Sequence, residues 1–398
     1  MHCCVGLMAP SWHRTWENAV QRRPRAAAVI TLLARHPVPA LLAMATLLGS
    51  LVQPLAAQGD ALLFVSAGRR LVGSHGLDVF NNPSLQVGPT YLLLLGLIDK
   101  LARSLGVPVW VAVGGLQSLM LTGLCLTVVR VAGLPTVAYG GVGLPLVLGG
   151  PLAEVLLNGH PEEVGVGFLL VLAAYAAGRQ RVLLPAILVA LASTSKLWGV
   201  IGFALLVAGT SEKKVDLRRS AQRISMTTLL CAAAYLPFFA TGTVRTFDFA
   251  WRSDPYSVLG TLTGYQGAFP FPARLAQVLA AGGIALVLVV QRRSPPQVLV
   301  GAVAMRLLAD PLRQPYYWSN LVVLVLLAAW SSRARSLRFR AAISGAVPAA
   351  ALLPYLVTAS VEAWCDLVFL AVLLAGALLG TRRHKVVESE GRVEVRAG

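Results

Sequence analysis

Apolar runs separated by short polar linkers make up most of this chain. The runs cover residues 38–57, 110–130, 135–152, 163–178, 182–195, 197–210, 224–241, 272–291, 296–309, 316–331, 341–359 and 361–380. The shorter runs predict helices that are tilted, broken or shielded by neighbours, because a perpendicular membrane helix needs about 20 apolar residues. The pattern predicts an all-α fold, a polytopic transmembrane bundle of about 12 spans with both termini on one side.

Residues 88–105 are an apolar stretch that does not resemble a span. Asp99, Lys100 and Arg103 follow after only about ten apolar residues, which is typical of an amphipathic helix on the membrane surface. We therefore predict an amphipathic first outer loop. With this loop outside, the basic linkers fall inside, as the positive-inside rule requires; they lie at Arg130, Arg179, Arg181, 213–223, Arg292, Arg293, 333–340 and 382–385.

The two ends of the chain are polar. Residues 1–37 carry five arginines against Glu17 and predict a cytoplasmic basic tail, and residues 381–398 predict a second cytoplasmic polar tail. Residues 38–380 form the transmembrane domain of a multi-pass plasma-membrane protein. The alternative is a cleaved signal, because Leu55-Ala56-Ala57 resembles a small-residue cleavage site. The long region before it and the many spans after it favour a tail.

Composition agrees with a membrane protein. Hydrophobic residues make up 56% of the chain and charged residues 13%, and the mean hydropathy is +0.70. These values exclude a soluble enzyme. The five cysteines form neither a disulfide framework nor a zinc spacing. We attribute the net charge of +17 to topology and anionic lipid, since no aromatic and basic module for nucleic acid accompanies it.

Two polar segments interrupt the central apolar runs. Asn158-Gly159-His160-Pro161-Glu162-Glu163 stands before one run, and Lys196 lies within Ser193–Trp198 between two others. Ionisable groups are costly in lipid unless they line a site. Two structural explanations remain open: Pro161 followed by two acids is also a common helix start, and Lys196 could extend to the interface.

The predicted topology brings several other polar segments to the same outer face. Asp60 follows the first span, Arg252 and Asp254 lie in the loop 242–270, and Arg313, Tyr316 and Tyr317 lie in the segment 310–318. A carboxylate can take the proton of an acceptor hydroxyl, and cations can stabilise a departing phosphate. Aromatic rings can stack on sugars. These residue types favour glycosyl transfer from a lipid-phosphate donor at the outer face.

The order of motifs resembles the GT-C superfamily of integral membrane glycosyltransferases. The motifs are Gly59-Asp60, Asn82-Pro83, Gly88-Pro89-Thr90-Tyr91, Asn158-Gly159-His160 and Ala192–Trp198. They are most similar to the family 87 type, the polyprenyl-phosphate-mannose-dependent mannosyltransferases of actinobacteria. The likeness covers about residues 38–331.

The resemblance implies inverting transfer of a sugar, mannose in that family, from a polyprenyl phosphate to a lipid-linked or cell-envelope glycan acceptor. It implies no cofactor and no metal. By position, Asp60 would be the catalytic carboxylate of the first loop, with His160 and Lys196 near the donor phosphate or the acceptor. Our candidate catalytic residues are Asp60, His160 and Glu163, and our candidate substrate-binding residues are Glu162, Lys196, Trp198, Arg252, Asp254, Arg313, Tyr316 and Tyr317.

Two other functions remain open. A transporter or lipid flippase would carry ionisable groups at mid-membrane and inverted repeats; Arg306 is the one deep candidate, and no repeat is visible. A non-catalytic scaffold for cell-envelope assembly would tolerate exchange of the outer acids. The predicted partners are the polyprenyl-phosphate sugar donor, a glycolipid or glycan acceptor and membrane lipid, without nucleic acid.

Overall fold

Helices form nearly all of the regular structure in this computed structural model. It describes residues 31, 35–73, 76–207, 216–240, 244–332, 335–352 and 356–379. The two predicted tails lie almost wholly outside these residues. The helices are α4 (Pro37–Val52), α5 (Gly59–Leu71), α6 (Pro89–Ser104), α7 (Val109–Val131), α8 (Val137–Leu148), α9 (Pro151–Leu157), α10 (Glu162–Gly178), α11 (Leu183–Ser195), α12 (Gly202–Leu205), α13 (Leu217–Ala240), α14 (Val258–Thr263), α15 (Phe271–Val290), α16 (Pro295–Leu308), α17 (Pro315–Ser331), α18 (Leu337–Leu352) and α19 (Ala359–Leu379).

Short elements complete the chain. In the described part of the chain, four 3₁₀ helices cover Gln53–Ala56, Gly76–Asn81, Leu197–Ile201 and Thr246–Asp248. Strands β1 (Trp251–Arg252) and β2 (Ala268–Phe269) pair antiparallel within the loop that joins α13 to α15. The prediction of an all-α bundle is confirmed apart from this two-residue pairing.

Among the described residues, six helical segments are long and apolar enough to cross a membrane. They are Pro37–Ala56, Val109–Val131, Val137–Leu157, Leu217–Ala240, Phe271–Val290 and Ala359–Leu379. This content supports a multi-pass membrane protein. The helices α10, α11, α16, α17 and α18 occupy other predicted runs but are shorter, with 13 to 17 residues.

Several predicted runs have different boundaries in the structure; for example, α13 already begins at Leu217 and α18 ends at Leu352. Helical structure in the run 135–152 extends to Leu157. The chain turns at Gly150, at φ 106°, and Pro151 then starts the short helix α9. The run 197–210 is helical only from Leu197 to Leu205 within the described residues. Gly199 packs there against the end of α11, since a Cβ on it would lie 2.4 Å from the Ala192 carbonyl.

Helix α10 is the centre of the main core. It packs against α7, α11, α16 and α17, and most of its residues are buried. Small residues permit close helix packing. A Cβ on Gly167 of α10 would lie 2.1 Å from the Asn320 side chain of α17, and one on Gly49 of α4 would lie 2.2 Å from the Gly114 oxygen of α7.

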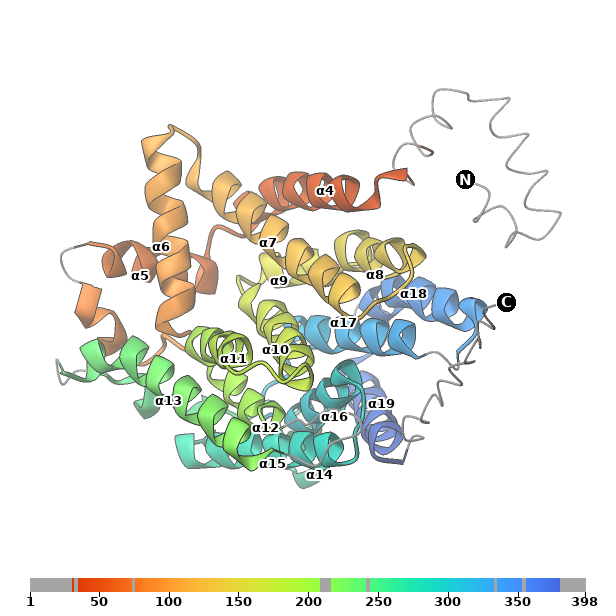
Figure 1. Cartoon of the computed structure of the whole chain (residues 1–398). Coiled ribbons are helices and arrows are strands. Elements are labelled where there is room, and N and C mark those ends of the chain that lie inside the picture. The colour runs from red at the N-terminus through yellow and green to blue at the C-terminus, as the bar shows by residue number, and fades with distance from the viewer. Residues whose placement is uncertain are drawn as a thin grey trace, which may run out of the picture.

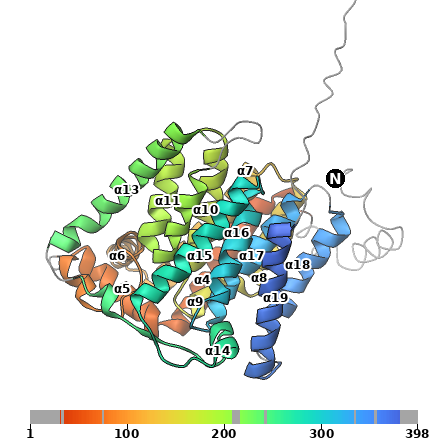
Figure 2. The same cartoon turned by 90° about the horizontal axis from the view of Figure 1, so that it is seen from below.

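Helices α5 and α6 form a second, smaller core. It contains Phe64, Tyr91, Leu92, Leu95 and Phe238, and it lies at one side of the bundle (Figure 1). In Figure 2, α6 is seen nearly end-on, whereas α10, α11, α15 and α16 run lengthwise. Helix α6 therefore runs across the direction of the bundle, as an amphipathic helix of an outer loop would.

Candidate active site

The turn between α9 and α10 places His160 beside α5. Gly159 has φ 75°, a left-handed conformation that favours glycine. A Cβ there would also lie 2.6 Å from the backbone nitrogen of Ala61. The backbone N–H of His160 donates to the Val155 oxygen at 2.7 Å, which closes the turn. Residue 159 thus allows the first turn of α5, with Asp60, to approach the imidazole.

His160 lies between two carboxylates. Its Nε2 is 2.9 Å from Oδ2 of Asp60, and its Nδ1 is 2.7 Å from Oε1 of Glu162. Tyr316 stacks on the ring, with centroids 4.2 Å apart and an interplanar angle of 18°, and Phe64 meets it edge-on at 5.3 Å. His160 and Glu162 are buried, whereas the Asp60 side chain is 55% exposed. The imidazole therefore connects an exposed carboxylate to a buried one.

The charges around the imidazole favour an ionised pair. The hydrogen bond with His160 is the main cause that holds the pKa of Asp60 below its ordinary value, against partial burial. Burial and the charge of Lys196 act to lower the pKa of His160, but the carboxylates of Glu162 and Asp60 outweigh them and raise it. Asp60 thus stays ionised at neutral pH, and the imidazolium form of His160 is stabilised.

Lys196 lies at the break between α11 and the following 3₁₀ helix. Its backbone is extended, at φ −149° and ψ 138°. Its Nζ donates to Oε1 of Glu162 at 2.8 Å and lies 3.4 Å from Oε1 of Glu163. The N–H of Gly88 donates to the Ser195 oxygen at 2.8 Å, which ties the start of α6 to this break. Lys196 is buried, and two carboxylates already neutralise its charge.

Arg306 extends the buried network beyond Glu163. Its Nη1 donates to Oε2 of Glu163 at 3.0 Å, and its Nη2 is 3.8 Å from Oδ2 of Asp310. The guanidinium carbon lies 5.2 Å from the Trp198 ring centroid and 4.6 Å from that of Tyr317. Burial raises the pKa of Asp310, against the charge of Arg306. The rings of Trp198 and Tyr317 therefore contact the Arg306 guanidinium and support the buried ion network.

Eight of the eleven predicted site residues meet in this cluster. They are Asp60, His160, Glu162, Glu163, Lys196, Trp198, Tyr316 and Tyr317. Trp198, Tyr316 and Tyr317 are buried against Arg306 and His160, and their predicted contact with substrate stays a prediction.

The other three predicted site residues lie elsewhere. Arg313 pairs with Glu362 and Asp366 of α19. Arg252 is exposed on β1, and the Asp254 carboxylate accepts the N–H of Tyr256 at 2.8 Å. The predicted outer loops do meet, because the N–H of Asp254 donates to the Pro311 oxygen at 2.8 Å. The face that we predicted for these three side chains does not place them in the cluster.

The prediction left out Arg306, Asp310 and Gln277 as site residues. Gln277 donates from Nε2 to Oδ2 of Asp310 at 3.0 Å and to the Arg306 oxygen at 2.9 Å. A signal for Arg306 existed, because it is a lone cation in the apolar run 296–309. No pattern in the sequence indicates that α16 would bring this cation to Glu163.

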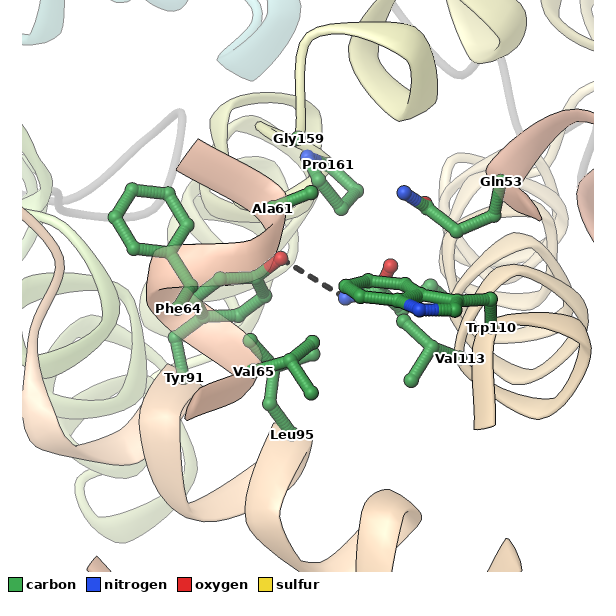
Figure 3. A pocket seen from close by; sticks show the side chains of 11 residues that line it. Gln53, Ala61, Phe64, Val65, Tyr91, Leu95, Trp110, Val113, Gly159 and Pro161 are labelled. Atoms are coloured by element: carbon green, nitrogen blue, oxygen red, sulfur yellow. Dashed lines mark hydrogen bonds between the residues drawn. The ribbon is translucent and has the colours of Figure 1, made fainter. Parts of the chain in front are cut away.

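A small cavity of about 10 Å³ adjoins the cluster (Figure 3), with room for about one water molecule. Gln117 donates to the Tyr91 hydroxyl at 2.9 Å on its wall. The cavity is lined by Gln53, Ala61, Phe64, Val65, Tyr91, Leu95, Trp110, Val113, Gln117, Gly159 and Pro161. Within the described residues, no group of three or more histidine, cysteine, aspartate or glutamate side chains is arranged to hold a metal ion.

The arrangement is suited to proton transfer at Asp60. A half-exposed, ionised carboxylate is oriented by a buried imidazole, and Glu162 and Lys196 hold that imidazole from behind. In comparisons with known proteins, no family model, curated protein or solved structure matches this chain.

Proposed function

We propose that this protein is a membrane glycosyltransferase that moves a hexose from a polyprenyl phosphate to a lipid-linked or cell-envelope glycan. We propose mannose as the hexose because of the resemblance of the motifs to family 87. The observation that carries the proposal is the pair of Asp60 and His160. An accessible carboxylate oriented by a buried partner is what general-base activation of a hydroxyl requires. The likeness of the motifs to GT-C enzymes supports the same function.

The reaction is a single displacement at the anomeric carbon. Asp60 takes the proton of the acceptor hydroxyl while the acceptor oxygen bonds to that carbon. The bond from the anomeric carbon to the phosphate oxygen breaks, and the lipid phosphate leaves with the electron pair. One displacement inverts the configuration and forms no covalent enzyme intermediate.

The buried residues hold the base in position. His160 orients the Asp60 carboxylate through the 2.9 Å contact, and Tyr316 fixes the plane of the imidazole by stacking on it. Glu162 and Lys196 hold the other side of the ring. We assign Lys196 this positioning role because Glu162 and Glu163 already neutralise its charge.

We propose a topology of twelve membrane segments for this enzyme. The six long helices are joined by α10, α11, the segment Leu197–Leu205, α16, α17 and α18. In this topology Asp60, the turn before α10, the Lys196 break and the loops around 244–270 and 309–314 face outward. The chain is then a plasma-membrane protein with both termini in the cytoplasm.

Transfer of label tests the function. Membranes that contain the protein are incubated with radiolabelled polyprenyl-phosphate mannose, and lipids and glycans are then extracted. We expect a labelled product that is absent from membranes without the protein. Failure to form any product with several polyprenyl-phosphate sugars would contradict the proposal and favour a transporter.

A further inference from the structure

The cations of the buried cluster are already matched by acids. Lys196 contacts Glu162 and Glu163, and Arg306 contacts Glu163. A phosphate would have to displace these carboxylates to reach either cation. An anionic substrate group therefore needs another cation near the cluster.

Arg274, in the first turn of α15, meets this need. Its Nη1 donates to the neutral Oε1 of Gln86 at 2.7 Å, and its guanidinium carbon lies 5.5 Å from the Trp251 ring centroid. No carboxylate of the described residues forms a salt bridge with it. Its side chain is half-buried. Neither Nε nor Nη2 of Arg274 belongs to the side-chain atoms that are fully buried and lack a hydrogen-bond partner. The guanidinium thus keeps donors for an anion.

Gln86 connects Arg274 to the outer loops. Its Nε2 donates to the oxygens of Pro83 at 2.6 Å and Thr246 at 3.2 Å, which joins the first outer loop to the loop after α13. Two residues further on, Gly88 donates to the Ser195 oxygen beside Lys196. Three residues further along α15 from Arg274, Gln277 donates to the Arg306 oxygen and to Oδ2 of Asp310. Arg274 therefore lies at the edge of the buried cluster.

Aromatic side chains beside Arg274 form a rim, which we define as Phe239, Phe247, Phe249, Trp251 and Phe271. Phe247 meets Phe271 edge-on at 4.8 Å and stacks with Phe239 at 6.3 Å. Phe249 meets Trp251 edge-on at 4.8 Å. Phe239 is 50% exposed and Phe247 39% exposed, so the rim offers apolar surface next to a cation.

We propose that Arg274 binds the phosphate of a polyprenyl phosphate whose chain lies along this aromatic rim. An arginine guanidinium forms charge-assisted hydrogen bonds with phosphate oxygens. The apolar rim accounts for a lipid rather than a soluble ligand. The assignment of this ligand as sugar donor rests on the proposed function, whereas binding itself does not.

Binding of farnesyl phosphate to the full chain in nanodiscs tests the site. Farnesol tests binding of the isoprenoid tail alone, and inorganic phosphate tests binding of the anion alone. We expect Arg274→Gln to weaken farnesyl phosphate binding by about tenfold to a hundredfold, because the variant loses charge-assisted hydrogen bonds to the phosphate. Farnesol binding should stay unchanged, inorganic phosphate should bind far more weakly than farnesyl phosphate, and Arg274→Lys should retain part of the affinity.

Arg245→Gln is the matched control. Arg245 lies in the loop after α13, which also carries Phe247, is exposed and pairs with Asp248 at 3.0 Å, so its replacement removes one positive charge outside the site. Thermal unfolding of each variant checks that it remains folded. Unchanged farnesyl phosphate binding in folded Arg274→Gln, an equal loss in Arg245→Gln, or no binding by the wild type would overturn the proposal. Binding that depends on Arg274 without sugar transfer would contradict the proposed function alone.

Discussion

Replacement of Lys196 by methionine tests the buried ion network. The change keeps an unbranched side chain of similar length but removes the positive charge from between Glu162 and Glu163. Glu162 then retains His160 as its cationic partner, and Glu163 retains Arg306. All of these side chains are buried, so water cannot replace the lost ammonium group.

The distances set the size of the expected effect. With an effective dielectric constant of about 20, charges at 2.8 Å and 3.4 Å attract by about 6 and about 5 kcal/mol. Desolvation of the ions offsets most of this gross attraction. Removal of one partner of a buried pair costs about 3–5 kcal/mol when the other partner is left without a counter-charge. Glu162 and Glu163 keep His160 and Arg306, so this range is an upper limit for Lys196→Met. We expect Lys196→Met to lower the free energy of unfolding by less than this limit but by more than replacement of an exposed lysine.

A double-mutant cycle with Glu162→Gln measures the interaction itself. Side chains in contact show coupling energies of about 0.5–3 kcal/mol, and we expect the upper part of this range. Unfolding by denaturant is measured in detergent, with tryptophan fluorescence as the signal. Lys100→Met is the control, because Lys100 is exposed on α6 and should change the free energy of unfolding by about 0.5 kcal/mol at most. A coupling near zero, or equal stability of Lys196→Met and Lys100→Met, would refute the reasoning.

Three further predictions concern topology, pH and the turn before α10. Single cysteines at the exposed Leu217 and Tyr265 should differ in labelling by an impermeant thiol reagent, with position 265 labelled from outside; equal or reversed labelling contradicts the topology. His160, whose pKa is raised, stabilises the fold fully below about pH 6.5 and loses this contribution as the pH rises through its raised pKa. The cost of His160→Gln in unfolding free energy should therefore shrink at alkaline pH, and a cost that grows would exclude a bridging imidazolium. Gly159→Ala should slow sugar transfer strongly, because the new Cβ would lie 2.6 Å from the Ala61 nitrogen; a normal transfer rate would contradict this account of the turn.

The apolar runs predicted the helices well, since length and composition determine them locally. Their ends depended on contacts that a single run does not contain. The 135–152 run continued as α9 because Pro151 restarts a helix after the turn at Gly150. The pairing of Trp251–Arg252 with Ala268–Phe269 could not be predicted, because strands of two residues are too short to show an alternation of polar and apolar positions.

The candidate site was predictable where a charge interrupts an apolar run. Glu162, Glu163 and Lys196 stood out for this reason, and they do meet. Arg306 carried the same signal, but its partner depends on the packing of α16 against α10. Arg313 was grouped with the site because it was predicted to lie on the same outer face, and α19 supplies its acids instead. Topology assigns a residue to a face, while tertiary packing decides which side chains touch.

The most direct measurement is the rate of sugar transfer by Asp60→Asn. Asparagine keeps the size and hydrogen bonding of Asp60 but cannot accept the acceptor proton, and general-base assistance contributes about 100- to 10,000-fold. We predict a fall in rate of about 100-fold or more in protein that inserts and unfolds like the wild type. A near-normal rate in Asp60→Asn, together with loss of transfer in Glu163→Gln, would contradict the account and place the base in the turn before α10.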